Sequence, residues 1–474
     1  MKVLEIIHIS AECYPVAKVG GLADVVGAIA KYQFNAGHNV SVVVPCYETK
    51  FIKENEFETI HWSQVKLGHF NFPFSVLKGI NHNLGFNLYL ITIPELFDRG
   101  EIYGYKDDIE RFLSFQIATL DWFVAHNLLP DVVHCHDHHS AVIPFMMQQA
   151  FDYEKLRPVP TVLTVHNALY QGQFGFDKLH YFPSYDLSKT PLLEWSGCIN
   201  SLAVGLKCAR AITTVSPNYL NEINYNGYGL EMLFNQVRYK SRGILNGIDN
   251  DVWNPKIDPL IATNYDVDDF EVGKQKNKEK LCKLFNFNVE YPLISFVGRL
   301  YEEKGADLLS EVARKAISTN NNKINILILG SGNKVIEDSL KLVLNDFSSN
   351  YNLSIEFNEK LAHQIYAGSD FILMPSRMES CGLNQMYAYR YGAIPVVRRT
   401  GGLKDTVVDI SENGFGICHD HATVDDVCDA IQRACELYKE KEKIKVIAKS
   451  GMVLNHSWEK AYQEYLEMYN LIIK

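Results

Sequence analysis

Short apolar runs recur along the whole chain, and longer segments with helix-like spacing of apolar residues separate them. Continuous apolar runs are typical of strands covered on both faces, as in a parallel sheet. The alternation of such strands with helices predicts doubly wound α/β domains. We expect strands at Val3–Ile9, Val40–Val44, Leu88–Ile93, Val132–Cys135, Thr161–Val165, Ala211–Val215, Leu293–Val297, Ile324–Leu329, Phe371–Met374 and Ile394–Val397.

The segment from Leu245 to Pro259 interrupts this alternation. It is rich in Asn, Asp and Pro, which favour turns over regular elements. A chain of 474 residues is long enough for two domains with separate cores. We therefore expect one Rossmann-like domain over residues 1–248 and a second over 249–457. Residues 458–474 are expected to form a final helix, amphipathic over Trp458–Ile473.

Composition narrows the classes of function. The net charge of −10 argues against nucleic acid or an anionic membrane as a partner, since both require a basic surface. No apolar run is long enough to cross a bilayer, and Val3–Ile9 is too short and too charged for a secretion signal. The ten cysteines form no C-x-x-C pair and show no zinc-site spacing. They predict reduced thiols in a cytoplasmic protein.

A glycine-rich loop occurs twice. Residues 20–26 read GGLADVV and residues 401–407 read GGLKDTV. The first copy precedes a helix expected over Ala23–Phe34. Its glycines let backbone amides approach a ligand, and the helix N-terminus together with Lys18 adds positive charge suited to a phosphate. It matches neither a dinucleotide fingerprint nor a Walker loop. The second copy is either a ligand loop or a structural turn.

Charged residues follow two strands of the second predicted domain. Arg299 and Lys304 come after Leu293–Val297, where α/β sheets bind ligands, and both side chains suit a phosphate. A surface ion pair is the alternative interpretation. Glu379 lies in a turn after Phe371–Met374, so its carboxylate can reach a sugar hydroxyl, and the amides near Gly382 suit phosphate. A weaker candidate, G-S-G-N at 330–333, follows the strand that ends at Leu329.

Histidines are concentrated at residues 134–139, which read HCHDHH. The cluster looks like a metal site, but the hydrolase pattern H-x-H-x-D-H requires Asp at 138, where this chain has His. We therefore expect no metal there, and expect Asp137 and His139 to face a ligand cleft. His166 ends the strand Thr161–Val165 and is either a buried core histidine or a ligand contact.

Eight segments together resemble bacterial glycogen synthases and plant starch synthases, and they occur in the order of that family. Their sequences are KVGGLADVV at 18–26, HxHDxH at 134–139, TVHN at 164–167, VSP at 215–217, LNGIDxxxWxP at 245–255, GRLxxxKG at 298–305, PSRxExCGLxQ at 375–385 and VRRTGGLxDTV at 397–407.

The resemblance implies the GT-B fold, in which two Rossmann-like domains face a central cleft and the last helix crosses back to the first domain. It implies retaining transfer of glucose from ADP-glucose to the non-reducing end of an α-1,4-glucan such as glycogen, with release of ADP. It implies neither a cofactor nor a metal. The oligomeric state stays open.

The resemblance also assigns roles. Lys18 and the Gly20 and Gly21 amides would bind the donor phosphates, Arg299 and Lys304 would neutralise the leaving diphosphate, and Glu379 would bind hydroxyls of the donor sugar. His166 would lie against the donor glucose with its backbone carbonyl near the anomeric carbon. The implied catalytic residues are Glu379, His166, Arg299, Lys304 and Asp137, and the implied donor-binding residues are Lys18, Gly20, Gly21, Asp24, Asn246, Arg299, Lys304, Cys381, Gly382 and Leu383.

The chain departs from the family pattern in places. His138 replaces a Trp, and Met378 and Ser380 replace an aromatic residue and a Pro. Tyr387 stands where the broader E-x7-E pattern of retaining transferases has its second Glu, which favours the glucan synthase branch. Three alternatives stay open: UDP-glucose as donor, a different acceptor, or a catalytically silent glucan-binding protein.

Overall fold

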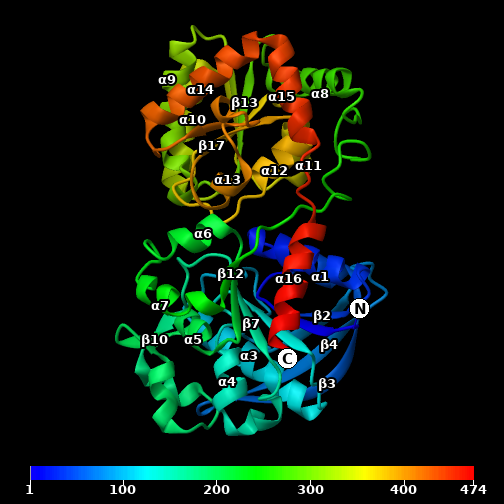
Figure 1. Cartoon of the computed structure of the whole chain (residues 1–474), viewed down its shortest axis with the longest axis vertical. Helices are drawn as coiled ribbons and strands as arrows, with labels where there is room; N and C mark the ends of the chain where they lie inside the picture. Colours follow the sequence, from blue (N-terminus) through cyan, green and yellow to red (C-terminus); the bar gives the residue numbers. More distant parts are fainter. Residues whose placement is uncertain (1, 474) are drawn as a thin grey trace. The chain divides into compact units, whose positions relative to one another are not determined.

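The computed structural model describes residues 2–473, and the chain divides into two compact units (Figure 1). Unit 1 comprises Met1–Gly247 and Trp458–Lys474, and unit 2 comprises Ile248–Ser457. Within residues 2–473, no helix combines the length and the apolar character that crossing a bilayer requires.

Unit 1 is built on a nine-stranded sheet in the order β12-β11-β7-β6-β1-β2-β5-β4-β3. The strands from β12 to β5 are parallel, and β4 and β3 add an antiparallel hairpin at one edge. The parallel strands are added outward on both sides of β1, so the carboxyl end of β1 lies at the switch point where doubly wound sheets bind ligands. The strands are β1 (Glu5–Ile9), β2 (Asn39–Pro45), β3 (Glu56–Leu67), β4 (Phe70–Ile80), β5 (Asn87–Thr92), β6 (Val132–His136), β7 (Thr161–Val165), β11 (Ala211–Thr214) and β12 (Ser241–Gly243).

Every strand expected from an apolar run is present, with ends that differ by two residues at most. The hairpin β3–β4 was not predicted. Its residues are mostly exposed or half-buried, so they form no continuous apolar run. A small separate sheet of β8 (Gln173–Phe174), β9 (Glu194–Trp195) and β10 (Cys198–Asn200) was missed for the same reason, because its strands are only two or three residues long.

Two helices from opposite ends of the sequence pack side by side on one face of this sheet: α1 (Gly21–Asn35) and α16 (Trp458–Ile472) (Figure 1). Trp458 and Tyr465 of α16 join Ile6 and Ile29 in one apolar cluster. The amphipathic helix predicted over Trp458–Ile473 is thus confirmed, and its apolar face belongs to unit 1. The other helices of this unit are α2 (Lys50–Glu54), α3 (Asp108–Ala125), α4 (Ile143–Gln149), α5 (Ser201–Cys208), α6 (Pro217–Glu222) and α7 (Glu231–Gln236).

Unit 2 has a six-stranded parallel sheet in the order β15-β14-β13-β16-β17-β18, also doubly wound. Its strands are β13 (Leu293–Val297), β14 (Asn325–Leu329), β15 (Tyr351–Ser354), β16 (Phe371–Met374), β17 (Ile394–Arg398) and β18 (Ile417–His419). Its helices are α8 (Phe270–Phe285), α9 (Leu309–Thr319), α10 (Lys334–Phe347), α11 (Glu359–Gly368), α12 (Asn384–Arg390), α13 (Gly401–Thr406), α14 (Val424–Lys439) and α15 (Lys441–Met452).

The core of unit 2 is formed where apolar strand residues meet the buried faces of its helices. Phe371 and Val396 on the sheet pack in one cluster with Ile317 of α9 and Ile431 of α14. Because β13 lies between β14 and β16, the loops after β13 and β16 leave the sheet next to each other. These two loops carry Arg299, Lys304 and Glu379.

Candidate active site

A partly buried ion pair joins the two loops of unit 2. Lys304 Nζ lies 2.7 Å from both carboxylate oxygens of Glu379. Ser376 Oγ donates to the same carboxylate at 3.1 Å, and Glu379 is only 8% exposed. Lys304 is thus half of a partly buried ion pair, with side-chain exposures of 26% for Lys304 and 9% for Glu379. Its role as a phosphate-binding residue stays a prediction. A cation and an anion that are far apart in the sequence are held at the carboxyl edge of the sheet.

Arg299 extends the charged group on the same loop. Its guanidinium pairs with the Glu303 carboxylate and lies 5.6 Å from the centre of the Tyr301 ring. The Glu303 carbonyl accepts hydrogen bonds from the amides of Arg377 and Met378, at 2.9 and 3.1 Å. These backbone bonds fasten the loop after β13 to the loop after β16, so Arg299, Lys304 and Glu379 belong to one connected structure.

The second glycine-rich loop supports Glu379 from behind. Gly402 N–H donates to the Glu379 carbonyl at 3.2 Å. A Cβ on Gly401 would lie 1.7 Å from the Glu379 carbonyl oxygen, and one on Gly402 would lie 2.3 Å from that of Cys381. Only glycine permits this approach. Of the two interpretations of this loop, the structural one accounts for its glycines.

The turn that carries Cys381, Gly382 and Leu383 leads into α12. Gly382 has a φ of 73°, in the left-handed region that favours glycine. Gln385 Nε2 donates to the carbonyls of Cys381 and Gly382 at 3.2 and 2.9 Å, which holds the turn from within. Cys381 is 4% exposed, so it is a packed residue. Three of the predicted donor-binding residues of unit 2, Cys381, Gly382 and Leu383, therefore lie in one turn held by Gln385.

The G-S-G-N segment after β14 has a structural explanation. A Cβ on Gly330 would lie 1.8 Å from the Gly298 carbonyl oxygen, and the Leu300 amide donates to the Ser331 carbonyl at 2.9 Å. Asn333 caps α10 through its side chain. The segment therefore supports the backbone next to Arg299.

In unit 1, the first glycine-rich loop is held by Glu12. This carboxylate is 4% exposed and accepts from the amides of Val19 and Gly20 at 2.6 and 2.9 Å, and from the Tyr103 hydroxyl at 2.7 Å. Burial raises the pKa of Glu12. Sequence reasoning missed this residue, although an acid that closely follows a strand at the switch point is a usable signal.

Glu12 changes what the loop can offer a ligand. Because the Gly20 amide already donates to Glu12, a phosphate would have to displace the carboxylate to use it. Gly21 begins α1, and a Cβ there would meet open space. Lys18 Nζ lies 2.7 Å from the Asp24 carboxylate. The predicted residues Lys18, Gly20, Gly21 and Asp24 thus lie together at the start of α1.

Asp137 and His166 are brought together at the carboxyl ends of β6 and β7. Asp137 has a φ of 55°, and its carboxylate accepts from the amides of His166 and Asn167 at 2.7 and 3.3 Å. Burial raises the pKa of Asp137 to about 7 and lowers the pKa of His166 to about 3. Asp137 therefore orients the peptide of His166, and His166 is neutral at physiological pH.

Asn246 is 5% exposed, and its Oδ1 has no hydrogen-bond partner among the described residues. A buried amide oxygen without a partner costs free energy unless a ligand or water supplies the hydrogen bond. His139 packs at 4.8 Å from the Tyr103 ring and is buried, so it is a packing residue in this structure.

The chain shares its whole length with known glucan synthases. Residues 5–236 match the starch synthase catalytic domain, and residues 277–450 match the glycosyl transferases group 1. A glycogen synthase of Flavobacterium johnsoniae is 63% identical over 471 residues, which cover 99% of this chain and 100% of that protein. The chain belongs to the glycogen synthase and starch synthase family. A glycogen synthase of Streptococcus pneumoniae serotype 4 is 34% identical over 484 residues, covering 99% of this chain and 100% of that protein.

Solved structures confirm the GT-B fold. The catalytic domain of starch synthase IV from Arabidopsis thaliana, bound to ADP and acarbose, has a TM-score of 0.92 at 30% identity, with 100% of both chains covered. Sucrose-phosphate synthase from Thermosynechococcus elongatus has a TM-score of 0.61 at 16% identity, with 98% of both chains covered, which shows the fold alone. The family predicted from the sequence motifs is therefore confirmed, and so is its identity as a glycosyltransferase.

Tyr387, where other retaining transferases of the E-x7-E pattern have a glutamate, is a packing residue in this family member. Its ring stacks on Trp253 at 3.7 Å, and His363 stacks on Trp253 at 4.0 Å. The Tyr391 hydroxyl donates to Asp258 at 2.5 Å. Both tyrosines are buried.

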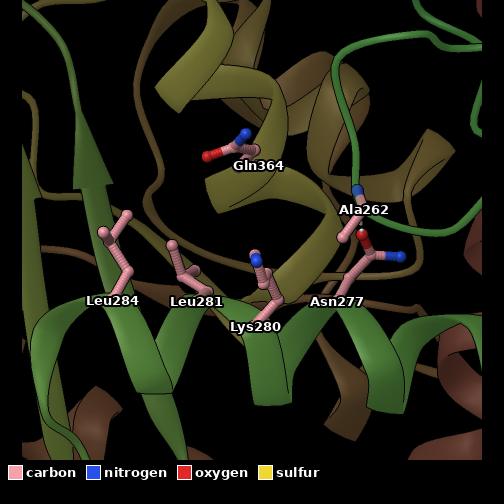
Figure 2. A pocket seen from close by; sticks show the side chains of 6 residues that line it. All are labelled: Ala262, Asn277, Lys280, Leu281, Leu284 and Gln364. Atoms are coloured by element: carbon pink, nitrogen blue, oxygen red, sulfur yellow. Dashed lines mark hydrogen bonds between the residues drawn. The ribbon is translucent and has the colours of Figure 1, made fainter.

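Unit 2 also contains a small hollow between α8 and α11 (Figure 2). Leu281 and Leu284 form its apolar wall. The Ala262 amide donates a hydrogen bond to Asn277 Oδ1 at 2.9 Å. Its volume of about 60 Å³ is far below that of pockets that bind drug-sized ligands. None of the catalytic or donor-binding residues named above lines it.

Proposed function

We propose that this protein is a glycogen synthase that transfers glucose from ADP-glucose to the non-reducing end of an α-1,4-glucan, with retention of configuration and release of ADP. The observation that carries the proposal is the partly buried Lys304–Glu379 pair beside Arg299, because it sets cations for a diphosphate next to a carboxylate for sugar hydroxyls. The full-length relative named a glycogen synthase and the plant neighbour bound to ADP and acarbose support the same substrates.

Cleavage of the bond between sugar and diphosphate creates negative charge on the diphosphate and positive charge on the sugar ring. In the proposal, Arg299 and Lys304 neutralise the diphosphate, and Lys18 does so from the first glycine-rich loop. Preorganised cations of this kind lower the barrier because they need no reorientation during the reaction. These three cations supply the charge for which other transferases use a metal, so we expect neither a metal nor a cofactor.

The remaining residues orient the donor sugar. Glu379 binds its hydroxyls, and Asp137 holds the His166 peptide so that the His166 carbonyl stands near the anomeric carbon. Asn246, with its unpaired buried Oδ1, binds the donor or the acceptor.

The donor is tested by measuring incorporation of labelled glucose into glycogen from ADP-glucose and from UDP-glucose at equal concentrations. We expect incorporation from ADP-glucose to be at least about tenfold faster, a difference of about 1.4 kcal/mol in transition-state binding. The opposite preference would support the UDP-glucose alternative. Glycogen binding without incorporation from either donor would support the silent glucan-binding alternative.

Replacing Gly401 with Ala tests the support of Glu379. The added Cβ meets the Glu379 carbonyl, and the φ of 45° is unfavourable for Ala, so the loop after β16 must shift. We expect at least about a tenfold loss of transfer rate, because small displacements of positioning groups cost that much or more. The matched control is Gly100→Ala, where a Cβ meets nothing within 4 Å. Equal rates for both variants, each shown by its thermal transition to be folded, would contradict the supporting role.

A further inference from the structure

A continuous chain of side-chain hydrogen bonds runs through the interior of unit 1. It starts at His166, whose Nε2 lies 3.0 Å from Nδ1 of His136. His136 Nε2 lies 2.9 Å from Nδ1 of His8. His8 Nε2 lies 2.8 Å from Oε1 of Gln33, near the end of α1. All four residues are buried, with 0% exposure except for the 7% of His166.

The chain continues to the C-terminal helix. Gln33 Nε2 donates to the Tyr469 hydroxyl on α16 at 3.2 Å. That hydroxyl lies 2.7 Å from Nδ1 of His134, and His134 Nε2 lies 2.6 Å from Oγ1 of Thr164. Thr164 ends the chain on the Thr213 hydroxyl at 2.6 Å. Tyr469 of α16 is therefore connected to His166 through Gln33, His8 and His136.

The proton positions along this chain depend on one another. A neutral imidazole has one N–H donor and one acceptor nitrogen. The Gln33 oxygen can only accept, so His8 donates from Nε2 and must accept at Nδ1. His136 then donates to His8 from Nε2 and accepts at Nδ1. His166 must in turn donate from Nε2, which leaves its Nδ1 without a proton.

The histidines must be neutral to share protons in this pattern, and burial keeps them neutral. It lowers the pKa of His8 to about 4 and the pKa of His166 to about 3, and it holds the pKa of His136 well below its usual range. The ring nitrogen that remains on His166, Nδ1, accepts no hydrogen bond from the described residues. It is the nitrogen available to a ligand.

We propose that Gln33 and Tyr469 are positioning residues that act through His8 and His136 to hold His166 as its Nε2–H tautomer, so that the bare Nδ1 accepts a hydroxyl hydrogen of the bound donor sugar. The statement that this hydroxyl belongs to the donor sugar rests on the proposed function. The tautomer itself does not, because the hydrogen-bond chain is complete without a ligand.

A metal ion is the competing interpretation of the same histidines. One ring nitrogen from each of His8, His134 and His136 lies within 4.8 Å of the others. However, all six ring nitrogens of these residues already have hydrogen-bond partners in the protein. We call this hydrogen-bonded chain the relay; its members are His166, His136, His8, Gln33, Tyr469, His134, Thr164 and Thr213. A metal would have to break the relay at His8 and His136, so metal binding and the relay are mutually exclusive.

The direct test is ¹⁵N NMR of the unliganded full-length protein with labelled histidine, with the His166 signals identified by their loss in His166→Gln. At pH 7.5 we expect a protonated Nε2 and an unprotonated Nδ1 on His166. The Nδ1–H tautomer, or a mixture of the two in the wild type, would overturn the proposal. So would binding of one zinc ion per chain, measured by elemental analysis after incubation with zinc and removal of the excess.

Substitutions test the role of the two positioning residues. In Gln33→Met, His8 loses its fixed acceptor, so we expect both tautomers of His166 and a kcat lowered by at least about tenfold, with a smaller change in KM for ADP-glucose. Tyr469→Phe keeps the ring packing and removes only the hydroxyl, so it provides the same readouts if Gln33→Met does not fold. A single unchanged tautomer in both variants would overturn the positioning role.

Gln116→Met is the matched control. Gln116 is 2% exposed and lies on α3, where its side chain bonds the Phe112 carbonyl and the Val142 amide outside the relay. We expect lower stability with the His166 tautomer and the kcat unchanged. Since the NMR measurement needs no substrate, a protein with the expected tautomer but no glucose transfer would refute only the proposed function.

Discussion

Replacing Lys304 with Ala is expected to lower the kcat of glucose transfer by about 100- to 1000-fold, the usual effect of removing one preorganised group that stabilises transition-state charge. The variant loses a cation for the diphosphate. It also leaves the Glu379 carboxylate, 8% exposed, without its ion-pair partner. A buried carboxylate that loses its ion-pair partner is destabilised, so the proposed sugar contact is weakened as well.

Steady-state kinetics with ADP-glucose and glycogen measure this effect. Lys315→Ala is the control, because Lys315 also forms an ion pair in unit 2, with Asp425, but both side chains are well exposed. Exposed pairs contribute little, so we expect nearly wild-type kcat for this variant. The double variant Lys304→Ala/Glu379→Ala should lose much less than the product of the two single losses, because the two residues act as a unit. A Lys304→Ala rate within threefold of the wild type would contradict the assigned role.

The sequence was sufficient to predict the sheets because their central strands are continuous apolar runs. Charged residues directly after such runs, such as Arg299 and Lys304, were identifiable because the ends of parallel strands converge at one edge. Glu12 was missed because its only signal, an acid soon after β1, does not show which groups it bonds. Its contacts with the Val19 and Gly20 amides depend on how the loop folds back.

The histidine relay was also not predictable from the sequence. His134 and His136 belong to a recognised motif, but His8 joins them only through the pairing of β1 with β6, which sets His8 opposite His134. Tyr469 arrives from the other end of the chain on α16. Contacts of this length depend on strand register and helix docking, which periodicity does not specify.

The two glycine-rich loops also show that similar sequences can have different surroundings in the fold. Their sequences share five of seven residues, yet a Cβ on Gly20 would meet nothing within 4 Å, whereas a Cβ on the matching Gly401 would meet the Glu379 carbonyl. What distinguishes a ligand loop from a supporting loop is the backbone packed against it, and that backbone lies elsewhere in the sequence.

Acidification from pH 7 to pH 5 is expected to destabilise unit 1 strongly. Four histidines of the relay, His8, His134, His136 and His166, are buried and have lowered pKa values. Below the unfolded pKa of about 6.5, the unfolded chain binds a proton at each while the folded protein does not, so stability falls as the pH falls. Asp137, with its pKa raised to about 7, acts in the opposite sense, because the folded state binds its proton first.

Glu12 has a raised pKa and opposes the histidines in the same way as Asp137. Burial also lowers the pKa values of His138 and His139, and it raises the pKa of Asp121 to about 6. The buried histidines therefore outnumber the carboxyls that oppose them, so we expect net proton uptake on unfolding near pH 5, with each net proton contributing about 1.4 kcal/mol per pH unit. Hydrogen exchange of the β1 and β6 amides, corrected for the intrinsic pH dependence of exchange, measures this slope within unit 1.

Two substitutions separate the relay from the other titrating groups. His134→Asn removes one buried histidine and should reduce the slope by about 1.4 kcal/mol per pH unit. His69→Gln removes a histidine that is exposed to water and should leave the slope unchanged. Equal slopes in all three proteins would mean that the buried histidines take up protons in the folded state. In that case the chain of neutral histidines that orients His166 would not exist at pH 5. Both the expected acid sensitivity and the neutral relay at that pH would then be contradicted.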